Sequence, residues 1–567
     1  MKSISYNYET LNDFRTYIYH MKADLKNKHY DVIVIGGGAT GAGTARDCAK
    51  RGLKVLLIER FDFTAGATGR NHGLLHSGAR YAVTDHESAV ECIQENMTLR
   101  KIASHCVEET GGLFVTLPDD DLEYQKTFIS SCLAAGIEAK QLDPKDVIRM
   151  EPSVNPDIIG AVSVPDGAVD PFRLTTANVL DARLHGADVL TYHEVVDLLQ
   201  ENGKIIGVKV RDSINGDEMD LHGSITVNAG GIWSHGIASK AGIKINMFPA
   251  KGALLIFGHR VNNMVINRCR KPADADILVP GDTISLIGTT SSRVPYDQVD
   301  NMDVTQEEVD ILLNQGCQLV PSLSWTRILR AYAGVRPLIA DDSDPSGRKI
   351  SRGIVCMDHA ERDGAEGFIT ISGGKLMTYR LMAETAADMV CKKLGVNAKC
   401  TTHIDPLPGS EKQEENPSSS KKHIINMSTG QLAAKERHGS LSSQIKYDDI
   451  DDTLVCECEQ VSVGEIKYAI DKLHVNNLVN LRRRTRLGMG TCQAGICASR
   501  AAAILGTRLG NDKAISDLKS FLQERWKGIR PVAWGRPLAE SYFTSWIYEG
   551  VCGMDNDKSS NSTTPLQ

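Results

Sequence analysis

The sequence predicts an α/β fold in which a dinucleotide-binding sheet is joined to a β-rich second domain and to a small C-terminal cysteine module. Residues 31–59 run in the order apolar strand, Gly-rich turn, helix, apolar strand, which is the order of a Rossmann-like unit. Two later segments, 227–234 and 367–380, repeat a strand that opens into a small-residue turn. Four cysteines clustered between residues 456 and 497 indicate the C-terminal module.

The Gly-rich turn of the first unit is Gly36-x-Gly38-x-x-Gly41. We expect Gly36 to permit the tight turn, Gly38 to let the backbone approach a pyrophosphate, and Gly41 to let the helix pack on the strand. The positive N-terminus of the helix then faces the phosphates. Glu59 closes the second strand, where its carboxylate can accept hydrogen bonds from the ribose of an adenosine and disfavours the 2′-phosphate of NADP.

Length and composition exclude several classes of protein. A chain of 567 residues suggests two to four domains, and a net charge of −7 with 24% charged residues gives no sign of a nucleic-acid binder. No apolar run reaches the length of a membrane span, and residues 1–29 lack the features of a secretory signal. We therefore expect a cytoplasmic protein, whose ten scattered cysteines are reduced thiols.

The chain after Glu59 continues with a stretch dense in Gly, His and Arg, residues 66–81. Interior glycines make a poor helix, so close backbone approach to a flat ligand explains this stretch better than an ordinary polar loop does. Thr68, Gly69, His72 and Gly73 are its candidate cofactor contacts. Further along, the pattern predicts helices at 87–104, 121–150, 172–185 and 305–316, and strands at 111–117, 160–164, 187–192, 205–211, 219–228, 252–257, 277–280 and 284–289.

Two further small-residue turns are candidates for contact with the same ligand. The turn after residue 227 offers Ala229 and Gly230, and the turn after residue 367 offers Gly373 and Gly374, followed by Leu376 and Met377. Several close backbone approaches suit a buried, permanently held flavin better than a nicotinamide cofactor that must come and go. The interpretation divides the first domain into segments of about 30–82, 160–235 and 350–395, and the β-rich domain into 83–159 and 236–349.

The C-terminal third begins at a change in composition. Residues 407–422 are rich in Pro, Ser and charge, and we expect a linker from 407 to about 450. The cysteine module should span 451–508 and a helical region 509–553, with a disordered tail at 554–567. A basic run, Arg482 to Arg486, lies inside the module. Such a run is usually a solvated face, although it can also offset the charge of a cluster or meet an acidic partner.

The four clustered cysteines are Cys456-x-Cys458 and Cys492-x4-Cys497. Four thiolates can hold a tetrahedral Zn²⁺ or an iron–sulfur cluster. The C-x-C pair spans too little chain to wrap one small ion and suits the wider [2Fe–2S] rhomb, which we favour over zinc and over unligated thiols. A flavin and such a cluster in one chain suggest that a two-electron donor is oxidised at the flavin and single electrons leave through iron and sulfur.

At this point the sequence resembles a known family. Residues 31–81, together with GAVDP, VNAGGIWS, AYAGVRP and GGKLMTYR, resemble the FAD-dependent glycerol-3-phosphate dehydrogenases, members of the wider D-amino-acid-oxidase-like flavoprotein group. The C-terminal cysteines resemble the [2Fe–2S] module of bacterioferritin-associated ferredoxins. Together they are similar, over roughly residues 30–553, to the anaerobic, quinone-linked members of the family. The extension 1–29 and the C-x4-C spacing depart from the usual pattern.

The resemblance implies an activity and partners that residue spacing alone does not give. The implied reaction is oxidation of sn-glycerol 3-phosphate to dihydroxyacetone phosphate, with hydride passing from C2 to FAD. The implied partners are a companion flavoprotein subunit and a membrane-anchoring iron–sulfur subunit that delivers electrons to a quinone. Those partners would then hold the chain at the inner face of the cell membrane. No nucleic acid is expected among its partners.

Substrate contacts implied by the resemblance fall on Arg336 in GVRP and Lys375 in GGKLMTY, with Arg80 and Tyr81 as further candidates. A substrate phosphate calls for such cations, because Arg offers paired donors and Lys a point charge. His76 and His72 are candidate general bases, since imidazole titrates near neutrality, or else packed residues beneath the flavin.

Two other functions remain open at this stage. One is an amino-acid or amine dehydrogenase of the same flavoprotein group, whose substrate carboxylate would also need an arginine. The other is a non-catalytic electron-transfer subunit in which the flavin only relays electrons.

Overall fold

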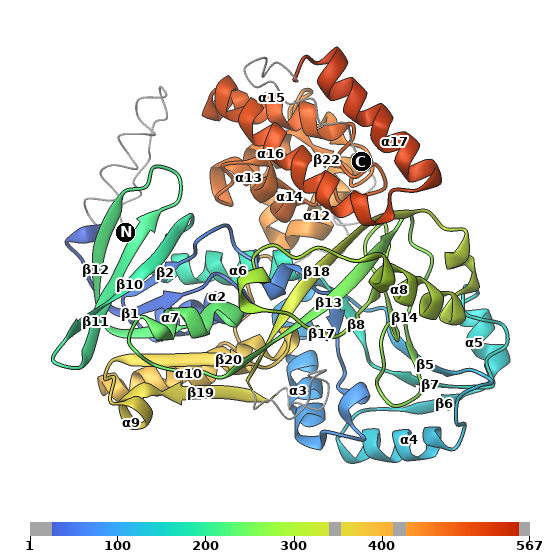
Figure 1. The fold of residues 1–567 in the computed structure, drawn as a ribbon, viewed down its shortest axis with the longest axis horizontal. Helices are drawn as coiled ribbons and strands as arrows, with labels where there is room; N and C mark the ends of the chain where they lie inside the picture. The colour runs from blue at the N-terminus through green and yellow to red at the C-terminus, as the bar shows by residue number, and fades with distance from the viewer. Residues whose placement is uncertain (1–24, 340–352, 412–426, 555–567) are drawn as a thin grey trace, which may run out of the picture.

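The computed structural model describes residues 25–339, 353–411 and 427–554. Two large β-sheets lie beside one another, and a group of C-terminal helices packs across them (Figure 1). The predicted α/β fold with a β-rich second sheet and a small C-terminal module is confirmed. Most of the predicted extension 1–29 and almost all of the predicted tail 554–567 lie outside the described residues. Within them, no helix combines the length and the apolar character that crossing a membrane requires.

The first sheet has eight strands built around a parallel centre. Its order is β10 (His193–Glu201), β11 (Lys204–Asp212), β12 (Glu218–Asn228), β1 (His29–Ile35), β2 (Val55–Ile58) and β9 (Asp188–Leu190), while β20 (Phe368–Gly373) pairs with both β12 and β19 (Ile354–Asp358). The pairs of β1 with β2 and β12, and of β12 with β20, are parallel. The carboxyl ends of these strands therefore meet at one edge of the sheet.

Both faces of this sheet are covered, which explains why its central strands are continuous apolar runs. Val32 and Val34 pack with helices α2 (Ala39–Lys50), α6 (Pro171–Leu184) and α10 (Tyr379–Leu394), and α2 lies against both other helices. Ile33 and Ile35 face the opposite side, where the largest apolar cluster continues into the second sheet. Successive side chains of β1 therefore contribute alternately to two apolar cores, one on each face of the sheet.

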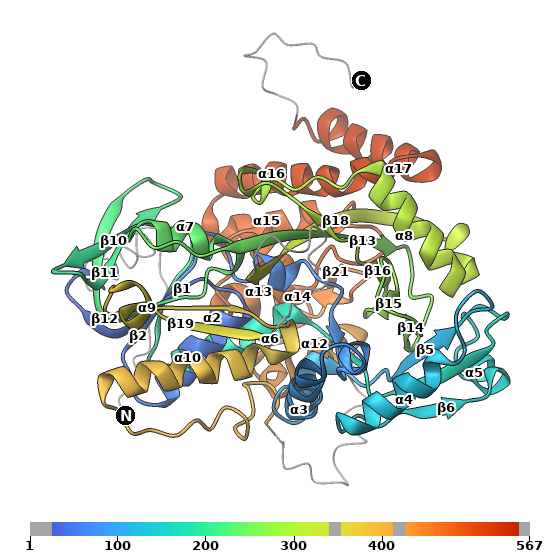
Figure 2. The same ribbon diagram turned by 60° about the horizontal axis from the view of Figure 1, so that its bottom comes forward.

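The second sheet has nine strands. Its order is β17 (Ser292–Arg293), β13 (Met247–Phe257), β16 (Ser285–Gly288), β15 (Ile277–Pro280), β14 (Val265–Arg268), β5 (Gly112–Thr116), β7 (Gly160–Val164) and β6 (Lys140–Leu142), and β18 (Ile328–Ile339) pairs with β13 along its length. Helices α3 (His86–Ile102), α4 (Tyr124–Ala134), α5 (Pro144–Met150) and α8 (Gln306–Leu319) belong to this half, whereas α7 (Ser234–Ser239) and α9 (His359–Asp363) flank the first sheet (Figure 2). A small third sheet joins β3 (Leu74–Leu75), β8 (Gly167–Val169) and β4 (Val107–Glu108).

Three expectations about the two large sheets and their helices differ from the structure. The segment 160–164, assigned to the first domain, is strand β7 of the second sheet. The predicted helix 121–150 is two helices, α4 and α5, with strand β6 between them. Strand β10 was not predicted, because its polar residues such as Glu194 and Asp197 break the apolar pattern of a strand that pairs on one side with β11.

The C-terminal helices begin inside the predicted linker. Helices α12 (Thr429–His438), α13 (Val463–Lys472), α14 (Leu478–Thr485), α15 (Cys497–Leu509) and α16 (Asn511–Ile529) share one apolar core with the hairpin of β21 (Leu454–Cys456) and β22 (Val461–Ser462), and α17 (Gly535–Trp546) follows. Residues 429–438 are thus helical and carry Ala434 into that core, whereas 412–426 lie outside the described residues.

The basic run, which we expected to be a solvated face, is instead an interface with the first domain. Arg484 and Arg483 both bind the carboxylate of Asp62, at 2.6 and 3.0 Å. Arg486 binds Asp282 at 2.5 Å and Glu459 at 2.9 Å. Asp62 and Asp282 lie far away in sequence, so these ion pairs fix the module against the rest of the chain, whereas Glu459 belongs to the module itself.

A buried ion network holds α12 to α13. Glu465 is fully buried and accepts hydrogen bonds from Arg437 at 2.6 and 2.8 Å and from His438 at 2.8 Å. Burial alone would raise the pKa of Glu465, but the charge of Arg437 and the hydrogen bonds from His438 and Arg437 outweigh burial and lower the pKa to about 2.

Replacing Glu465 by Gln should therefore destabilise the C-terminal module at neutral pH. The change leaves the buried Arg437 guanidinium without its counter-charge, which costs about 3–5 kcal/mol. Because the folded-state pKa lies below the ordinary value of 4.5, the carboxylate stabilises the wild type above about pH 4.5, and this contribution is lost as the pH falls toward 2. Calorimetric melting of the full chain at several pH values measures both effects.

The matched control is Asp471→Asn, which removes a half-exposed carboxylate 3.6 Å from Arg508 in the same module. An exposed pair of this kind contributes at most about 1 kcal/mol. A Glu465→Gln variant that melts like the wild type at neutral pH would show that the network does not hold α12 in place.

Candidate active site

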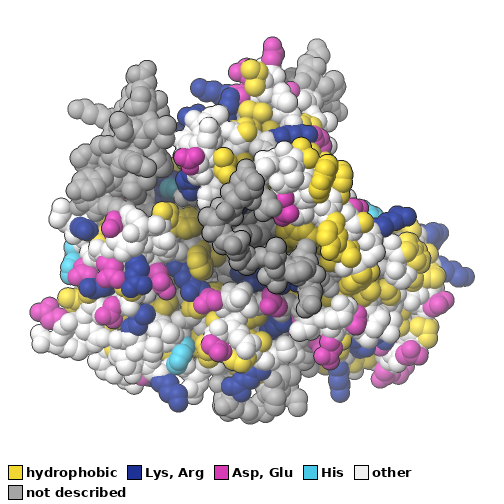
Figure 3. Space-filling model, turned by 45° about the horizontal axis from the view of Figure 1, so that its top comes forward, with side chains coloured by type: hydrophobic (Ala, Val, Ile, Leu, Met, Phe, Trp, Pro, Cys, Tyr) yellow, Lys and Arg dark blue, Asp and Glu magenta, His cyan; other side chains and the backbone are white. Residues whose placement is uncertain are grey.

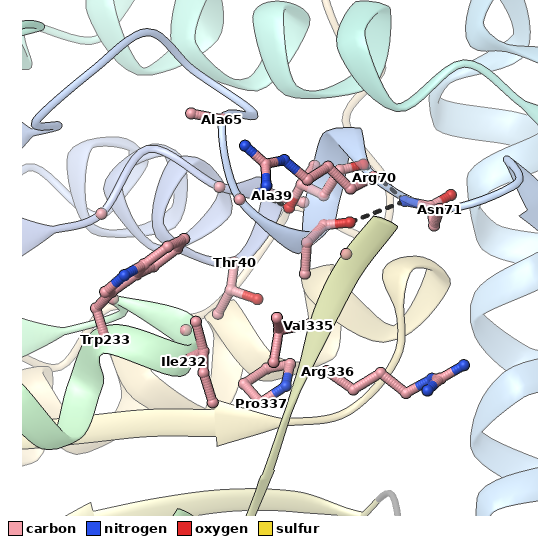
Figure 4. Close-up of a pocket in the computed structure, with 18 of the residues that line it drawn as sticks. Ala39, Thr40, Ala65, Arg70, Asn71, Ile232, Trp233, Val335, Arg336 and Pro337 are labelled. Carbon is pink, nitrogen blue, oxygen red and sulfur yellow. Dashed lines mark hydrogen bonds between the residues drawn. The ribbon is translucent and has the colours of Figure 1, made fainter. Parts of the chain in front are cut away.

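Three small-residue turns meet at the edge of the first sheet where the parallel strands end. They follow β1, β12 and β20, and they line one cavity of about 780 Å³. Residues of α2, of β18 and of the turn after β12 surround this cavity, and the side chain of Asn71 donates to the carbonyl oxygens of Ala67 and Thr68 (Figure 4). The volume suits a cofactor-sized ligand.

The turn after β1 has the backbone that the sequence predicts. Gly36 has φ +110°, and a Cβ there would lie 2.5 Å from the carbonyl oxygen of Ala229. A Cβ on Gly41 would lie 1.9 Å from the carbonyl oxygen of Gly36. Helix α2 begins after Gly38, and its first residues, Ala39 and Thr40, line the cavity, with the Ala39 N–H donating to the Thr68 hydroxyl at 3.1 Å. The positive end of this helix makes the cavity wall a candidate anion site. Only glycine fits this crossing of turn, helix and neighbouring strand.

Glu59 closes the same end of the cavity. Its two carboxylate oxygens accept hydrogen bonds from the backbone N–H of Gly37, at 2.7 Å, and of Phe61, at 2.9 Å. Burial raises the pKa of Glu59, and these two hydrogen bonds oppose the rise. Each oxygen keeps a further lone pair for a hydroxyl donor, which is the arrangement that an adenosine ribose requires.

The predicted cofactor residues divide into those that line the cavity and those that support it. The lining includes Gly36, Gly38, Glu59, Thr68, His72, Ala229, Gly230, Gly373, Gly374, Leu376 and Met377. Gly41, Gly69 and Gly73 lie behind this surface. A Cβ on Gly69 would come 2.3 Å from the carbonyl oxygen of Thr64, so these glycines permit close packing of the chain that forms the wall. The residues present fit a flavin dinucleotide.

The predicted substrate residues gather at the other part of the cavity. Arg336, Lys375, His76, Arg80 and Tyr81 all line it, although Lys375 is 39 positions after Arg336 and Arg80 lies some 250 positions before it. The Lys375 ammonium lies 4.6 Å from the centre of the Tyr81 ring, and the His76 ring lies 5.6 Å from the same ring. Cations and a titratable imidazole are thus placed together.

Hydrogen bonds and an ion pair decide how these cations are held. Arg336 donates to the carbonyl oxygens of Thr290, at 3.1 Å, and Lys251, at 3.3 Å, and to the hydroxyl of Thr289, which orient its guanidinium. Arg80 is paired with the buried carboxylate of Asp276 at 3.0 Å. The charge of Arg80 is therefore partly compensated within the protein.

Some lining residues carried no signal in the sequence. Gly252 on β13 is one, because a Cβ there would lie 2.7 Å from a terminal nitrogen of Arg336 and would displace that side chain. Gly252 belongs to no motif. Its role follows from the antiparallel pairing of β13 with β18, in which Gly252 lies opposite Gly334 and Ala250 lies opposite Arg336.

The four cysteines of the C-terminal module face one another. Side-chain hydrogen bonds link Cys497 to Cys456 and Cys492, and Cys492 to Cys458, and they lower the pKa of Cys492 to about 5. Four thiols brought together from a C-x-C pair and a C-x4-C pair are the ligand set that a [2Fe–2S] cluster requires.

Comparison with known proteins agrees with both parts of the chain. Residues 31–380 match the family of FAD dependent oxidoreductases, and residues 454–507 match the BFD-like [2Fe-2S] binding domain. The A subunit of the anaerobic glycerol-3-phosphate dehydrogenase of Haemophilus influenzae is 60% identical over 95% of this chain and 96% of its own length. The protein of the same name from Escherichia coli K12 is 59% identical over 93% of this chain and 98% of its own.

A solved structure confirms the fold. The glycerol-3-phosphate dehydrogenase of Bacillus halodurans, solved with FAD, superposes with a TM-score of 0.67 at 22% identity, covering 91% of this chain and 98% of that one. The resemblance inferred from the sequence is confirmed by these relatives. The chain is an FAD-dependent oxidoreductase with a [2Fe–2S] domain, and it belongs to the family of anaerobic glycerol-3-phosphate dehydrogenase A subunits.

Proposed function

We propose that this chain oxidises sn-glycerol 3-phosphate to dihydroxyacetone phosphate and passes the electrons through partner subunits to a quinone. The observation that carries the proposal is the convergence of Arg336 and Lys375 in the cavity that the three glycine-rich turns also line. Two cations beside a flavin site fit a substrate that carries a doubly charged phosphate. The relatives that share most of this sequence are named for that substrate.

The side chains of the cavity have distinct roles in this proposal. Arg336 holds the substrate phosphate through its planar guanidinium, and Lys375 adds a point charge above the Tyr81 ring. Arg80, which is already paired with Asp276, contributes less charge. When bound, FAD supplies a two-electron acceptor and the cluster supplies a one-electron exit.

A general base must take the hydroxyl proton as C2 is oxidised, and we assign that role to His76. The alternative, His72, accepts the backbone N–H of Leu74 on Nδ1 at 3.3 Å. A neutral His72 therefore carries its proton on Nε2, and that nitrogen is a donor and not a base. His76 is buried beside Tyr81 in the same cavity, and its imidazole is the side chain we assign to accept the proton.

The surface of the C-terminal helices supports the proposal of partner subunits. Large apolar side chains are exposed just before, along and just after α17, namely Trp534, Leu538, Tyr542, Phe543, Trp546 and Val551. Figure 3 views the molecule from the side of the C-terminal helices, and hydrophobic side chains gather on this face. Exposed patches of this kind mark protein or membrane contacts. We propose that a flavoprotein subunit and a membrane-anchoring iron–sulfur subunit bind the chain and hold it at the inner face of the membrane.

Anaerobic addition of glycerol 3-phosphate to the purified protein should bleach the flavin absorption band. The expected result follows from a phosphate-binding cavity beside the flavin site. Amino acids and amines, tested in parallel, should leave the band unchanged. Bleaching by an amino acid would favour the amine dehydrogenase, and no bleaching by any donor would favour a subunit that only relays electrons.

Replacing Arg336 should weaken substrate binding strongly. Truncation of one side of a buried charge pair costs about 2–5 kcal/mol of binding free energy. Arg336→Ala should therefore raise KM by the factor that corresponds to this loss. Arg336→Lys keeps the charge but loses the paired donors, and it should raise KM less. The measurement is the rate of anaerobic flavin reduction as a function of glycerol 3-phosphate concentration.

The control is Arg211→Ala, which removes a half-exposed arginine bound to Glu218 on the hairpin of β11 and β12. Flavin content and melting temperature should be measured for every variant, because Arg336 also orients residues 289 and 290. An Arg336→Ala protein that retains its flavin and the wild-type KM would remove Arg336 from the substrate site.

A further inference from the structure

Three side chains of the kinds that bind transition metals meet on the first domain, outside the flavin cavity. They are Glu384 of α10, and Cys400 and His403 of the segment that follows this helix. One ligand atom from each residue lies within 4.8 Å of the ligand atoms of the other two. None of the three residues lines the flavin cavity, and the proposed oxidation of glycerol 3-phosphate does not use them.

Cys400 and His403 form a C-x2-H pair on a tight turn of the backbone. The backbone N–H groups of Ile404 and Asp405 both donate to the carbonyl oxygen of Thr401, at 2.9 and 3.0 Å. This bonding is that of a single helical turn, in which side chains three positions apart lie near each other. Ligand pairs with two to four intervening residues are typical of zinc sites. One short stretch of backbone therefore offers a thiol and an imidazole together.

Two arginines of α2 hold this turn in place. Arg46 is buried and donates to the carbonyl oxygens of Thr402, at 3.4 Å, and Asp405, at 2.9 Å. Arg51 donates to the carbonyl oxygen of Ala398 at 3.3 Å. These hydrogen bonds fix the backbone on both sides of the thiol and of the imidazole, so the protein presents the two side chains in a defined arrangement.

The third side chain, Glu384, is held by an arginine whose charge is already balanced. Arg380 donates to both carboxylate oxygens of Glu95, at 2.6 and 2.8 Å, and these two side chains are buried. Arg380 also donates to Oε2 of Glu384 at 2.6 Å. Two carboxylates thus share one guanidinium, which leaves an excess negative charge. A cation bound to Glu384 would balance this charge.

The ligand atoms of this cluster are open to an ion. Within the described residues, the ring nitrogens of His403 and the Oε1 atom of Glu384 take part in no hydrogen bond, and the Cys400 sulfur has only the hydroxyl of Thr402, at 3.1 Å. His403 is exposed, whereas Glu384 and Cys400 are partly buried. An ion can therefore enter from solvent on the side of the imidazole.

We propose that Glu384, Cys400 and His403 bind one Zn²⁺, with a water molecule as the fourth ligand. Zinc accepts thiolate, imidazole and carboxylate in tetrahedral sites, whereas Mg²⁺ and Ca²⁺ prefer oxygen ligands. Ligand atoms on one Zn²⁺ lie about 3.3–3.6 Å apart at bond lengths of about 2.0–2.3 Å, so rotation of the exposed His403 side chain closes the site. The Cys400 thiol releases its proton to solvent when it binds. The ion ties the segment after α10 to that helix.

The test is titration of the full-length protein, with its FAD and cluster in place, with Co²⁺ and then with Zn²⁺. Co²⁺ takes the place of Zn²⁺ in such sites and gives a charge-transfer band when a thiolate binds it. We expect one Co²⁺ to bind per chain, with this band in the difference spectrum, and Zn²⁺ to remove the band. Zn²⁺ added alone should raise the melting temperature, because the site exists only in the folded chain.

Two ligand variants locate the bound ion. Cys400→Ser should abolish the thiolate band, and His403→Asn should weaken Co²⁺ binding at least about tenfold, because loss of a group that merely orients a metal ligand already costs about 10–100-fold in affinity. Should one of these variants not fold, the other still decides the result. Flavin and iron contents are measured for each protein, so that every titration is made on a chain with its cluster in place.

The matched controls are Cys317→Ser on α8 and His222→Asn on β12, which remove a partly buried thiol and an exposed imidazole elsewhere in the chain. Both should bind Co²⁺ like the wild type. No thiolate band on addition of Co²⁺, a band that Cys400→Ser retains, or an affinity that His403→Asn retains in full would each overturn the proposal.

Discussion

The structure depends on the approach of three backbone turns at the carboxyl edge of one parallel sheet. Gly36 lies so near the carbonyl of Ala229, and Gly41 so near that of Gly36, that any side chain at either glycine would force the turn and the helix apart. The same closeness directs the N-terminus of α2 into the cavity and brings Glu59 beside it. The predicted substrate residues on β18 and in the turn after β20 are placed relative to this edge, because β20 pairs with β12 of the first sheet and β18 pairs with β13 of the second.

A second constraint joins the flavin domain to the cluster module. Asp62 lies shortly after the strand that ends in Glu59, and it binds both Arg483 and Arg484 in the module. The segment that leaves the dinucleotide site thus also fixes the cluster-binding part of the chain. Electron transfer falls steeply with distance, so a fixed module suits the proposed passage of electrons from flavin to cluster.

The sequence pattern predicted those elements whose determining residues lie within one short segment. Elements that depend on contacts between distant segments were missed or assigned wrongly. Residues 31–59 fold as predicted because apolar runs, glycines and the terminal acid lie within one short segment. The basic run was misread because its acids lie far away, as Asp62 does from Arg484, 422 positions later. Helix α12 was hidden in a polar stretch, since the buried network of Glu465 stabilises it and its own pattern does not. Motifs supplied Arg336 and Lys375, whereas Gly252 could be found only from its place opposite β18. The roles of these site residues stay predictions.

The central claim is that electrons from glycerol 3-phosphate enter at the flavin and reach the [2Fe–2S] cluster within this one chain. Electron paramagnetic resonance of the purified protein, frozen after anaerobic addition of glycerol 3-phosphate, tests it most directly. The account predicts the signal of a reduced [2Fe–2S] cluster, which appears together with loss of the flavin band and is absent without substrate. A protein that bleaches its flavin yet shows no cluster signal, or that contains zinc in place of iron at Cys456, Cys458, Cys492 and Cys497, would contradict it.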